Sequence, residues 1–534
     1  MFKFLCVFLL FSVTSITPGL GIPHPNGQAF LPGRLPEQSL VGTGVSLYSY
    51  SKLLNPIESG NHRIEEWVEG DIRFVQRGGL LYELAQHPYF SDHQLRITEP
   101  QLCDPSVQQY SGYLDVSEGR HLFFWFFEAR NSPETAPVIL WLNGGPGCTS
   151  TTGLLFELGP CSVTDGGMNS TYNPHSWNEH ANVIFLDQPA GVGYSYSSDW
   201  SSSNTSPAVA KDVYAFFEIF FRRHSKYASL PLHIAAESYG GHYAPNIAYA
   251  IHMENLALET NPDPSLIKIN LESIMLGNGL TDPYTQFGST PEYACGGPYP
   301  LWKDPNCKEC TALRTDARIC QRLIKTCSLF NTKVTCAPAN LYCWQRVFGP
   351  VFEGSGQNPY DARKPCDRSP ENDGPYCYRQ LGWVEQWMND PLRKRELGVA
   401  PSRKYEACNA QVNMAFRLNG DGVKNSALLV RDLVNNGIRV LVYVGNAGEF
   451  FVGEERWMLA LDTKFTEEFT SSPALPWVTL SSGNIAGLVR SAGPGAGNYT
   501  FVNVYEAGHM VPYDQPAASL DLITRWISNE PLSL

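Results

Sequence analysis

Five short apolar runs constrain the fold of this chain more than any other feature of its sequence. Each run ends in turn residues, and they lie at 137–143, 182–189, 231–238, 273–279 and 438–445. Such runs are typical of strands that are buried on both faces of a parallel sheet. Between them, residues 206–224 and 425–437 have helical patterns. Alternating strands and helices predict an α/β fold with a mostly parallel central sheet flanked by helices.

The regions around this pattern divide the chain. Residues 110–116 and 121–129 predict an antiparallel hairpin. The alternation stops between residues 284 and 400, where cysteines, prolines and aromatic residues concentrate, and we expect a disulfide-rich cap insertion there. The predicted segments are a signal peptide (1–21), an N-terminal arm or short propeptide (22–60), the first part of the core (61–283), the cap (284–400) and the second part of the core (401–534).

Cysteine usage indicates an oxidising compartment. Of 14 cysteines, nine lie in the predicted cap: Cys295, Cys307, Cys310, Cys320, Cys327, Cys336, Cys343, Cys366 and Cys377. The C-x-x-C pair at Cys307 and Cys310 has a zinc-site spacing, but disulfides are favoured in a secreted chain, so we expect no metal and no cofactor. Removal of Cys6 with the signal leaves an odd number, which requires at least one unpaired or intermolecular thiol. The sequence leaves the connectivity of the cap open.

The N-terminus predicts entry into the secretory route. Lys3 precedes an apolar run at 4–13, which has the length of a signal-peptide core and falls short of the roughly 20 residues that span a membrane. The alternative is a buried N-terminal helix. Glycosylation sequons at Asn169, Asn204 and Asn498 fit the same compartment. We expect a secreted protein, or one that reaches the vacuole or lysosome, without a membrane anchor.

The charge balance limits the partners. With 39 basic and 52 acidic residues the formal net charge is −13, which disfavours nucleic acid or an anionic membrane surface as a partner. The sequence leaves the oligomeric state open.

Residues 235–245, AAESYGGHYAP, carry the strongest chemical signal. An apolar strand leads into Glu237-Ser238-Tyr239-Gly240-Gly241 and then into a helical pattern. This is the context of the nucleophile elbow of the α/β-hydrolase fold, in which a sharp turn exposes a serine. Ala236 occupies the position where the elbow usually has glycine. Alanine costs little stability there if the turn requires only that no bulky side chain be present. Taken alone, the segment could also be a plain turn.

Two other segments strengthen this interpretation. Gly144 and Gly145 follow the run at 137–143 and let backbone N–H groups approach a ligand, as an oxyanion hole requires; a simple tight turn is the alternative. Gly508 and His509 follow an apolar segment near the C-terminus. The order serine, acid, histidine is that of α/β-hydrolases. The sequence contains no H-E-x-x-H motif, which would indicate a metallopeptidase.

Together these segments resemble the serine carboxypeptidase family. The matching motifs are WLNGGPGC (141–148), FELGP (156–160), FLDQPAGVGYSYS (185–197), ESYGGHYAP (237–245) and GHMVPYDQP (508–516). The resemblance covers roughly residues 80–534. It implies that Ser238 is the nucleophile, that His509 is the general base, and that the amides of Gly145 and Tyr239 form the oxyanion hole.

The resemblance also implies a site for the C-terminal carboxylate of a peptide substrate. Asn143, Glu237 and the Gly144 amide would bind that carboxylate, with Glu157 as the hydrogen-bond partner of Glu237. Two carboxyls in one site share a proton, and a protonated glutamate can donate to the substrate, which favours acid pH. The family pattern further assigns Thr152, Phe156 and Met510 to the pocket for the leaving residue and pairs Cys148 with Cys408.

The catalytic acid departs from the family pattern. Where the family has a G-D-x-D turn, this chain has Gly445-Asn446-Ala447-Gly448-Glu449. An ungapped alignment puts the acid at Gly448, and Glu449 is the nearest carboxylate that can serve. The alternative is that Glu449 is a solvated loop residue and the triad is incomplete.

We therefore expect a serine carboxypeptidase that acts through an acyl-enzyme on Ser238. The alternatives are a related acyltransferase, in which an alcohol or amine replaces water, and a catalytically weakened protein that binds peptide C-termini.

Overall fold

The structure is a computed structural model that describes residues 65–533 except 70–71, 117–118, 199–201 and 449–452. The chain divides into Met1–Asn61 and one compact unit, His62–Leu534. The predicted signal peptide (1–21) and N-terminal arm (22–60) lie outside the described residues, as does Glu449.

A single large sheet organises the described residues, in the order β1-β2-β3-β4-β5-β6-β10-β7-β12-β13-β16-β19-β18-β17, with β11 paired to β6. Its strands are β1 (Glu65–Glu69), β2 (Ile72–Arg77), β3 (Leu80–Gln86), β4 (His93–Thr98), β5 (Gln109–Val116), β6 (Arg120–Phe127), β7 (Val138–Leu142), β10 (Asn182–Leu186), β11 (Tyr196–Ser197), β12 (Leu232–Glu237), β13 (Leu271–Gly277), β16 (Arg439–Gly445), β17 (Leu475–Val478), β18 (Ile485–Ala492) and β19 (Tyr499–Val504). Two small ribbons pair β8 (Cys161–Thr164) with β9 (Asn169–Tyr172) and β14 (Gln357–Asn358) with β15 (Asp361–Pro365).

The middle of the sheet is parallel, as the apolar runs predict. The five runs form β7, β10, β12, β13 and β16, which pair in parallel with one another and with β19. Both flanks are antiparallel, through β1–β6 on one side and β17–β18 on the other. The sequence did not predict β2–β4, because these strands mix half-buried polar residues with apolar ones and contain no continuous apolar run.

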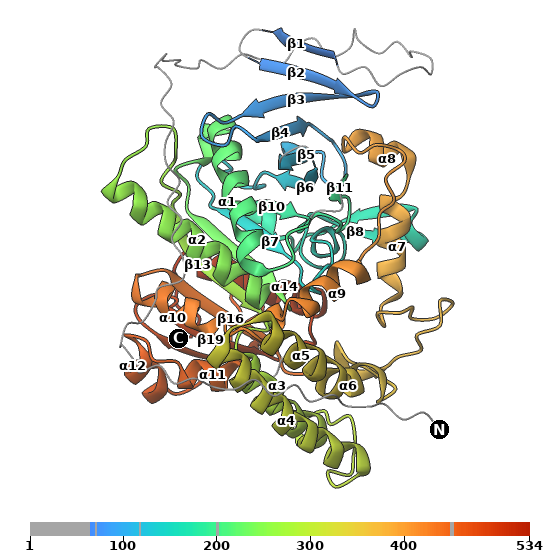
Figure 1. The fold of residues 1–534 in the computed structure, drawn as a ribbon, viewed down its shortest axis with the longest axis vertical. Helices are drawn as coiled ribbons and strands as arrows, with labels where there is room; N and C mark the ends of the chain where they lie inside the picture. Colours follow the sequence, from blue (N-terminus) through green and yellow to red (C-terminus); the bar gives the residue numbers. More distant parts are fainter. Residues whose placement is uncertain (1–64, 70–71, 117–118, 199–201, 449–452, 534) are drawn as a thin grey trace, which may run out of the picture. The chain divides into compact units, whose positions relative to one another are not determined.

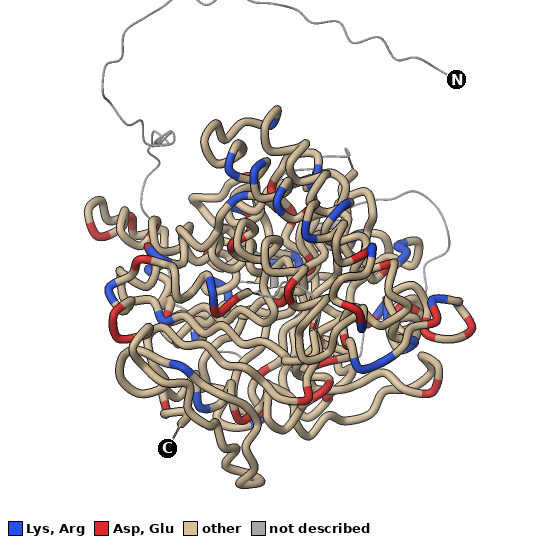
Figure 2. The backbone as a smooth tube through the Cα atoms, turned by 90° about the horizontal axis from the view of Figure 1, so that it is seen from below, with Lys and Arg blue, Asp and Glu red and all other residues tan. Residues whose placement is uncertain are grey.

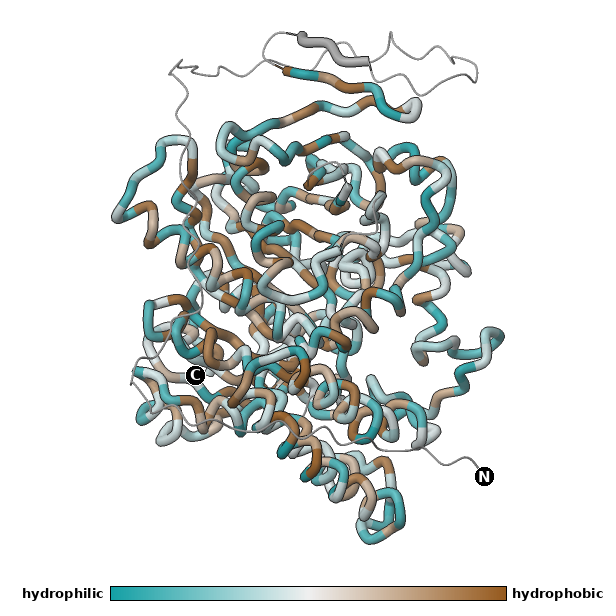
Figure 3. The backbone as a smooth tube through the Cα atoms, in the orientation of Figure 1, coloured by the Kyte–Doolittle hydropathy of each residue, from teal (hydrophilic) through white to brown (hydrophobic). Residues whose placement is uncertain are grey.

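Alternate residues of the central strands pack into two separate hydrophobic clusters. In β7, Val138 and Leu140 belong to one hydrophobic cluster, while Ile139 and Trp141 belong to the other. Helices α1 (Ser206–Arg223), α2 (Gly240–Thr260) and α10 (Ala427–Asn435) supply the first cluster, and α7 (Arg379–Met388) and α14 (Pro516–Ile527) supply the second. Figure 1 shows α1 and α2 crossing one face of the sheet, and Figure 3 shows strongly hydrophobic stretches on the central strands.

The predicted cap region occupies two places in the fold. Its first part forms α3 (Pro283–Gly296), α4 (Lys308–Phe330), α5 (Lys333–Cys343) and α6 (Gly349–Glu353), whereas α7 packs against β8 (Figure 1). The remaining α-helices are α8 (Pro391–Glu396), α9 (Ala410–Leu418), α11 (Glu454–Ala460), α12 (Thr466–Ser471) and α13 (Val511–Asp514). The short π-helices are η2 (Gly153–Glu157) and η6 (Trp344–Phe348), and the short 3₁₀-helices are η3 (Asp165–Gly167), η4 (Trp177–Glu179), η5 (Ser225–Tyr227) and η7 (Asp421–Val423).

Disulfides brace the helical part of this region, as its cysteine content predicts. The bonds Cys295–Cys310, Cys320–Cys343 and Cys327–Cys336 join α3, α4 and α5, and Cys366–Cys377 lies further along the predicted cap. The bonds Cys103–Cys161 and Cys148–Cys408 lie outside the cap. The pairing of Cys148 with Cys408 is confirmed. Cys310 bonds Cys295, which excludes a zinc site shared with Cys307, and Cys307 is the free thiol of the part of the chain that is described. Within that part, none of the helices has the length and apolarity needed to cross a membrane.

A buried ion pair ties three antiparallel strands together. Arg96 on β4 donates from Nε and Nη2 to the two oxygens of Asp115 on β5, over 2.8 and 2.7 Å. His121 on β6 bonds the same carboxylate at 2.6 Å through Nδ1. Burial by itself would raise the pKa of Asp115, but the hydrogen bond with His121 and the charge of Arg96 outweigh it and hold this pKa below its usual range. The ionised form of Asp115 is therefore the one that the fold stabilises.

We expect Asp115→Asn to lower the free energy of unfolding at pH 7 by about 3–5 kcal/mol, because it leaves the buried guanidinium of Arg96 without its counter-charge. A carboxyl with a depressed folded pKa stabilises the fold above its unfolded value, about 3.9, and this contribution is lost as pH falls further. Urea unfolding should therefore show a smaller difference between mutant and wild type at pH 3 than at pH 7. The exposed Asp462→Asn is the matched control; an effect of Asp115→Asn no larger than this control at pH 7 would contradict the assignment.

Candidate functional site

Ser238 occupies a strained turn between a buried strand and a helix. It follows β12, precedes α2 and has a φ of 64°, in the left-handed region that non-glycine residues rarely adopt. Its N–H donates to the Gly277 carbonyl at 3.0 Å, and its own carbonyl accepts from Leu280 N at 2.8 Å. The structure thus has the strand–serine–helix geometry of a nucleophile elbow.

The small residues around the elbow have a direct steric cause. A Cβ on Gly240 would lie 2.5 Å from the Cβ of Ala236, and a Cβ on Gly241 would lie 2.6 Å from backbone atoms of Leu280. Because the methyl group of Ala236 already fills the space, Gly240 must remain glycine. The elbow thus accommodates the methyl group of Ala236 opposite a glycine.

The Gly144–Gly145 turn, which follows β7, lies against the elbow. A Cβ on Gly144 would lie 2.3 Å from Tyr239 N and 2.8 Å from Ser238 Cβ. Gly145 has a φ of 110°, which is accessible to glycine and strained for other residues. The two segments that the sequence predicts to form an oxyanion hole are therefore in contact, although 94 residues separate Gly144 from Ser238.

His509 lies on the loop after β19 and is anchored by its backbone. Its N–H donates to Tyr360 O at 2.6 Å, and its carbonyl accepts from Asn278 Nδ2 at 2.7 Å. Asn278 follows Gly277, whose carbonyl holds the N–H of Ser238, so serine and histidine are bonded to the same turn at the end of β13. Burial lowers the pKa of the His509 imidazole to about 3.

Two buried carboxyls meet on one amide group beside the elbow. Asn143 Nδ2 donates to Glu157 Oε1 at 3.0 Å and to Glu237 Oε1 at 3.5 Å. The amide is itself fixed, because Asn143 Oδ1 accepts from Trp141 Nε1 and from Gly153 N. Burial raises the pKa of Glu157 to about 7, and burial together with the charge of Glu157 raises that of Glu237 well above its ordinary value. The pair therefore retains at least one proton at acid pH.

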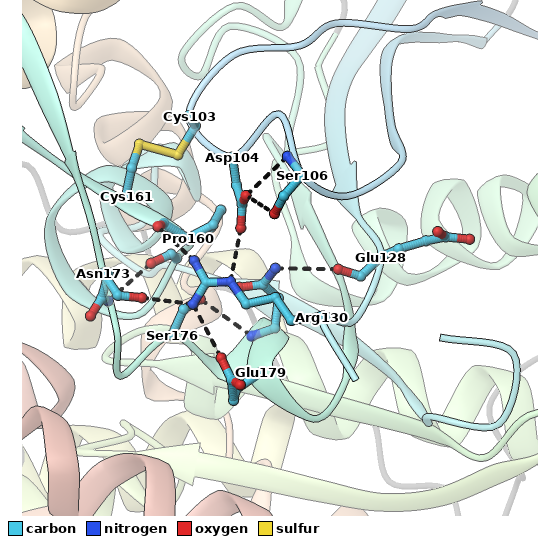
Figure 4. Close-up of polar contacts among 12 residues, drawn as sticks. Cys103, Asp104, Ser106, Glu128, Arg130, Pro160, Cys161, Asn173, Ser176 and Glu179 are labelled. Atoms are coloured by element: carbon cyan, nitrogen blue, oxygen red, sulfur yellow. Dashed lines mark hydrogen bonds and ion pairs between the residues drawn. A yellow bond between two sulfur atoms is a disulfide. The ribbon is translucent and has the colours of Figure 1, made fainter. Parts of the chain in front are cut away.

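A network around Arg130 holds the segment that follows Glu157 (Figure 4). Arg130 donates to Asp104 Oδ2 at 2.8 Å and to the carbonyls of Pro160 and Asn173 at 3.1 and 2.8 Å. The Cys103–Cys161 disulfide joins the same two stretches of chain. Sequence reasoning missed this support, because nothing in the sequence relates residue 130 to residue 160; only the fold brings them together.

The comparisons with known proteins agree with this geometry. A family model described as serine carboxypeptidase matches residues 100–529. The chain belongs to the serine carboxypeptidase family.

Its relatives cover most of the chain. It is 43% identical over 445 residues to carboxypeptidase Y of Candida albicans, covering 82% of this chain and 77% of that protein. It is 41% identical over 476 residues to carboxypeptidase Y homolog A of Ajellomyces dermatitidis, covering 87% of this chain and 81% of that protein. The crystal structure of Kex1(Δ)p, a prohormone-processing carboxypeptidase from Saccharomyces cerevisiae, matches with a TM-score of 0.65 at 24% identity over 80% of this chain and 92% of that one. The α/β-hydrolase fold and the serine hydrolase class are confirmed.

Phe156, which the family pattern assigns to the leaving-residue pocket, lies in an aromatic cluster. The Phe156 ring stacks on Tyr513 at 4.2 Å between centroids and meets Tyr378 edge-on at 5.4 Å. Thr152 and Met510 are nearly buried, with 7% and 6% of their surfaces exposed. Tyr378 and Tyr513 were not predicted as neighbours of Phe156: no motif includes Tyr378, and Tyr513 lies within GHMVPYDQP but was assigned no role there.

Gly448, where an ungapped alignment puts the catalytic acid, adjoins the backbone of His509. Glu449 lies outside the described residues. Gly448 is described, and a Cβ there would lie 3.3 Å from His509 N, so this position adjoins the histidine backbone. Asp361 and Asp514, the carboxylates beside Gly508, both form ion pairs with Arg363 and Lys364. These ion pairs make them weaker candidates for the acid.

The three sequons differ in accessibility. Asn169 is exposed, and its Nδ2 donates to Asp165 at 2.8 Å. Asn204 and Asn498 are half-buried. Exposure therefore favours Asn169 as a glycan acceptor.

Proposed function

We propose that this serine carboxypeptidase releases C-terminal residues from peptides through an acyl-enzyme on Ser238. The observation that carries the proposal is the contact between the strained elbow and the Gly144–Gly145 turn, which leaves room for backbone N–H groups and for no side chain. Such a site is suited to stabilise an oxyanion.

In the proposed reaction, Ser238 Oγ attacks the carbonyl carbon of the last peptide bond while His509 takes the hydroxyl proton. The N–H groups of Gly145 and Tyr239 bind the oxyanion. His509 then protonates the leaving amine as the C–N bond breaks. Water, deprotonated by His509, attacks the ester carbonyl; the ester C–O bond breaks, His509 returns the proton to Ser238 Oγ, and the shortened peptide leaves. Because burial keeps its imidazole neutral down to about pH 3, His509 stays able to accept a proton at acid pH.

Asn143, the Gly144 amide, Glu237 and Glu157 would select substrates with a free C-terminus. A fully ionised glutamate pair would repel the carboxylate, whereas a protonated carboxyl donates a hydrogen bond to it. The raised pKa values of both glutamates support this role and favour activity at acid pH. Thr152, Phe156 and Met510 would contact the leaving residue.

The secretory route belongs to the same proposal. The disulfide bonds of the chain support a secreted precursor with glycans at Asn169, Asn204 and Asn498. Its proposed segments are a signal peptide (1–21), an arm or propeptide (22–60), and a cap (284–400) between the core segments 61–283 and 401–534. A secreted protein, or one delivered to a vacuole or lysosome, would meet these conditions.

Ser238→Ala should abolish both labelling by a fluorophosphonate probe and release of the C-terminal residue from a blocked dipeptide, because it removes the nucleophile. The melting temperature should stay nearly unchanged. A matched control is Ser202→Ala, at a half-buried serine remote in sequence from the elbow. Wild-type protein that neither labels nor cleaves would show a non-catalytic binder of peptide C-termini, and undiminished cleavage by Ser238→Ala would exclude the mechanism.

The acid pair makes substrate binding depend on pH. KM for a peptide with a free carboxylate should rise as pH passes through about 7, because Glu157 then ionises and places a negative charge beside the substrate carboxylate, while Glu237 keeps the remaining proton. A peptide with an amidated C-terminus should show a flatter profile. Glu157→Gln should flatten the first profile, since it removes one of the two titrating groups. Parallel profiles for both substrates in the wild type would mean that the pair does not bind the carboxylate.

The identity of the acid can be decided by exchange of carboxylates. If Glu449 orients His509, Glu449→Gln should lower kcat by about 10²–10⁴ and leave KM nearly unchanged. Adding Gly448→Asp to this variant should restore activity, provided that the backbone yields enough to fit a side chain next to His509. Asp514→Asn is the control at a neighbouring carboxylate. A larger loss of kcat in Asp514→Asn than in Glu449→Gln would assign the role to Asp514 instead.

A further inference from the structure

An exposed apolar tip joins helices α4 and α5. Leu329, Phe330 and Val334 surround the short connection between the helices and are 81%, 65% and 82% exposed. Val334 and Leu329 have the two highest exposures of any large hydrophobic residue in the described part of the chain. Single exposed apolar residues are common on protein surfaces, but three at one tip form a patch that burial against a partner would stabilise.

The tip is held rigidly. Asn331 ends α4 with a φ of 44°, and Thr332 begins α5 with a capping box in which its side chain and that of Thr335 bond each other's backbone N–H groups. The Cys327–Cys336 disulfide closes the hairpin directly behind the turn. A rigid tip loses little conformational entropy when it is buried.

Positive charge surrounds this tip. Residues 317–352 contain five basic residues and no acidic one, in a chain whose net charge is −13. Arg318, Arg322 and Lys325 follow one another at helical spacing along α4 and are exposed, and the exposed Lys333 adjoins Val334. Figure 2 shows Lys and Arg gathered on neighbouring helical turns at one side of the view, with few acidic residues among them.

We propose that this tip, formed by Leu329, Phe330 and Val334 with the flanking Lys325 and Lys333, docks on the surface of anionic lipid bilayers. The apolar side chains enter the boundary between headgroups and acyl chains, while the ammonium groups remain with the lipid phosphates. This is peripheral binding through side chains and requires no membrane-spanning segment.

The net charge of the whole chain does not oppose this contact. At physiological ionic strength charges interact strongly only within a Debye length of about 8 Å, so a bilayer under the tip is affected mainly by the basic residues of α4 and α5. The sequence-based expectation that an anionic surface is disfavoured treats the charge as uniform. The structure shows a local excess of the opposite sign.

The test is flotation of the full-length protein with vesicles of phosphatidylcholine alone or with about one third phosphatidylserine. The wild type should float with the anionic vesicles, and binding should fall in high salt. Each basic residue near an anionic surface contributes about fivefold in partitioning, and reversal of its charge also adds repulsion, so Lys325→Glu/Lys333→Glu should reduce binding by about 25-fold or more. Leu329→Asp/Phe330→Asp should reduce it by at least about tenfold.

Matched controls come from other exposed positions. Leu480 and Leu392 are 70% and 75% exposed elsewhere on the protein, and Leu392→Asp/Leu480→Asp should leave binding unchanged. Cleavage of a soluble peptide reports folding of every variant independently of lipid. The proposal is overturned if the wild type does not float with anionic vesicles, or if the control leucines matter as much as the tip. It is also overturned if sedimentation shows self-association through the tip in place of vesicle binding.

Discussion

The contact between two turns is the constraint on which the site depends. Gly144, after β7, lies so close to Ser238 and Tyr239 that any side chain would collide with the elbow. The parallel pairing of β7 with β12 places the ends of both strands at the same edge of the sheet, so the turns meet there. The left-handed backbone of Ser238 is a strained conformation that the surrounding hydrogen bonds to Gly277 and Leu280 maintain. The sheet thereby fixes the backbone N–H groups of both turns at one edge.

Burial then sets the chemistry of the groups around this contact. Glu157 and Glu237 share the side-chain amide of Asn143 and are nearly buried, and this burial makes a proton on the pair favourable. Burial lowers the pKa of His509 and so has the opposite effect on its charge, keeping the imidazole neutral. The same physical cause therefore favours a neutral imidazole and a protonated carboxyl at a pH where both groups are ordinarily charged. The network of Arg130 and the Cys103–Cys161 disulfide supports this arrangement from behind Glu157.

Positive and negative charges are unevenly distributed in this protein. For contacts with a charged partner, the local charge therefore matters more than the net charge. The net charge of −13 describes the whole chain, yet residues 317–352 in and around α4 and α5 contain five basic residues and no acidic one, and they surround the exposed Leu329 and Phe330. A disulfide and a capped helix hold these residues outward. Because screening limits electrostatic attraction to short range, such a surface can bind a partner that the total charge would repel.

The sequence by itself determined the α/β class, the five central strands, helices α1 and α10, and the motifs that place Ser238, Gly144 and His509 at the ends of strands. The hydrophobic periodicity and the apolar content of a segment are local properties, so the sequence alone shows them. The family resemblance added Asn143, Glu157 and the pairing of Cys148 with Cys408. Only the tertiary structure decided that Cys103 bonds Cys161, that Arg130 supports the segment after Glu157, that Tyr378 and Tyr513 surround Phe156, and that α7 packs apart from α3–α6. These contacts join residues far apart in the chain, and their partners are chosen by how strands and helices pack. The role of Glu449 was predicted from its neighbours alone, and local sequence does not fix which carboxylate reaches His509, because that depends on the path of the loop in three dimensions.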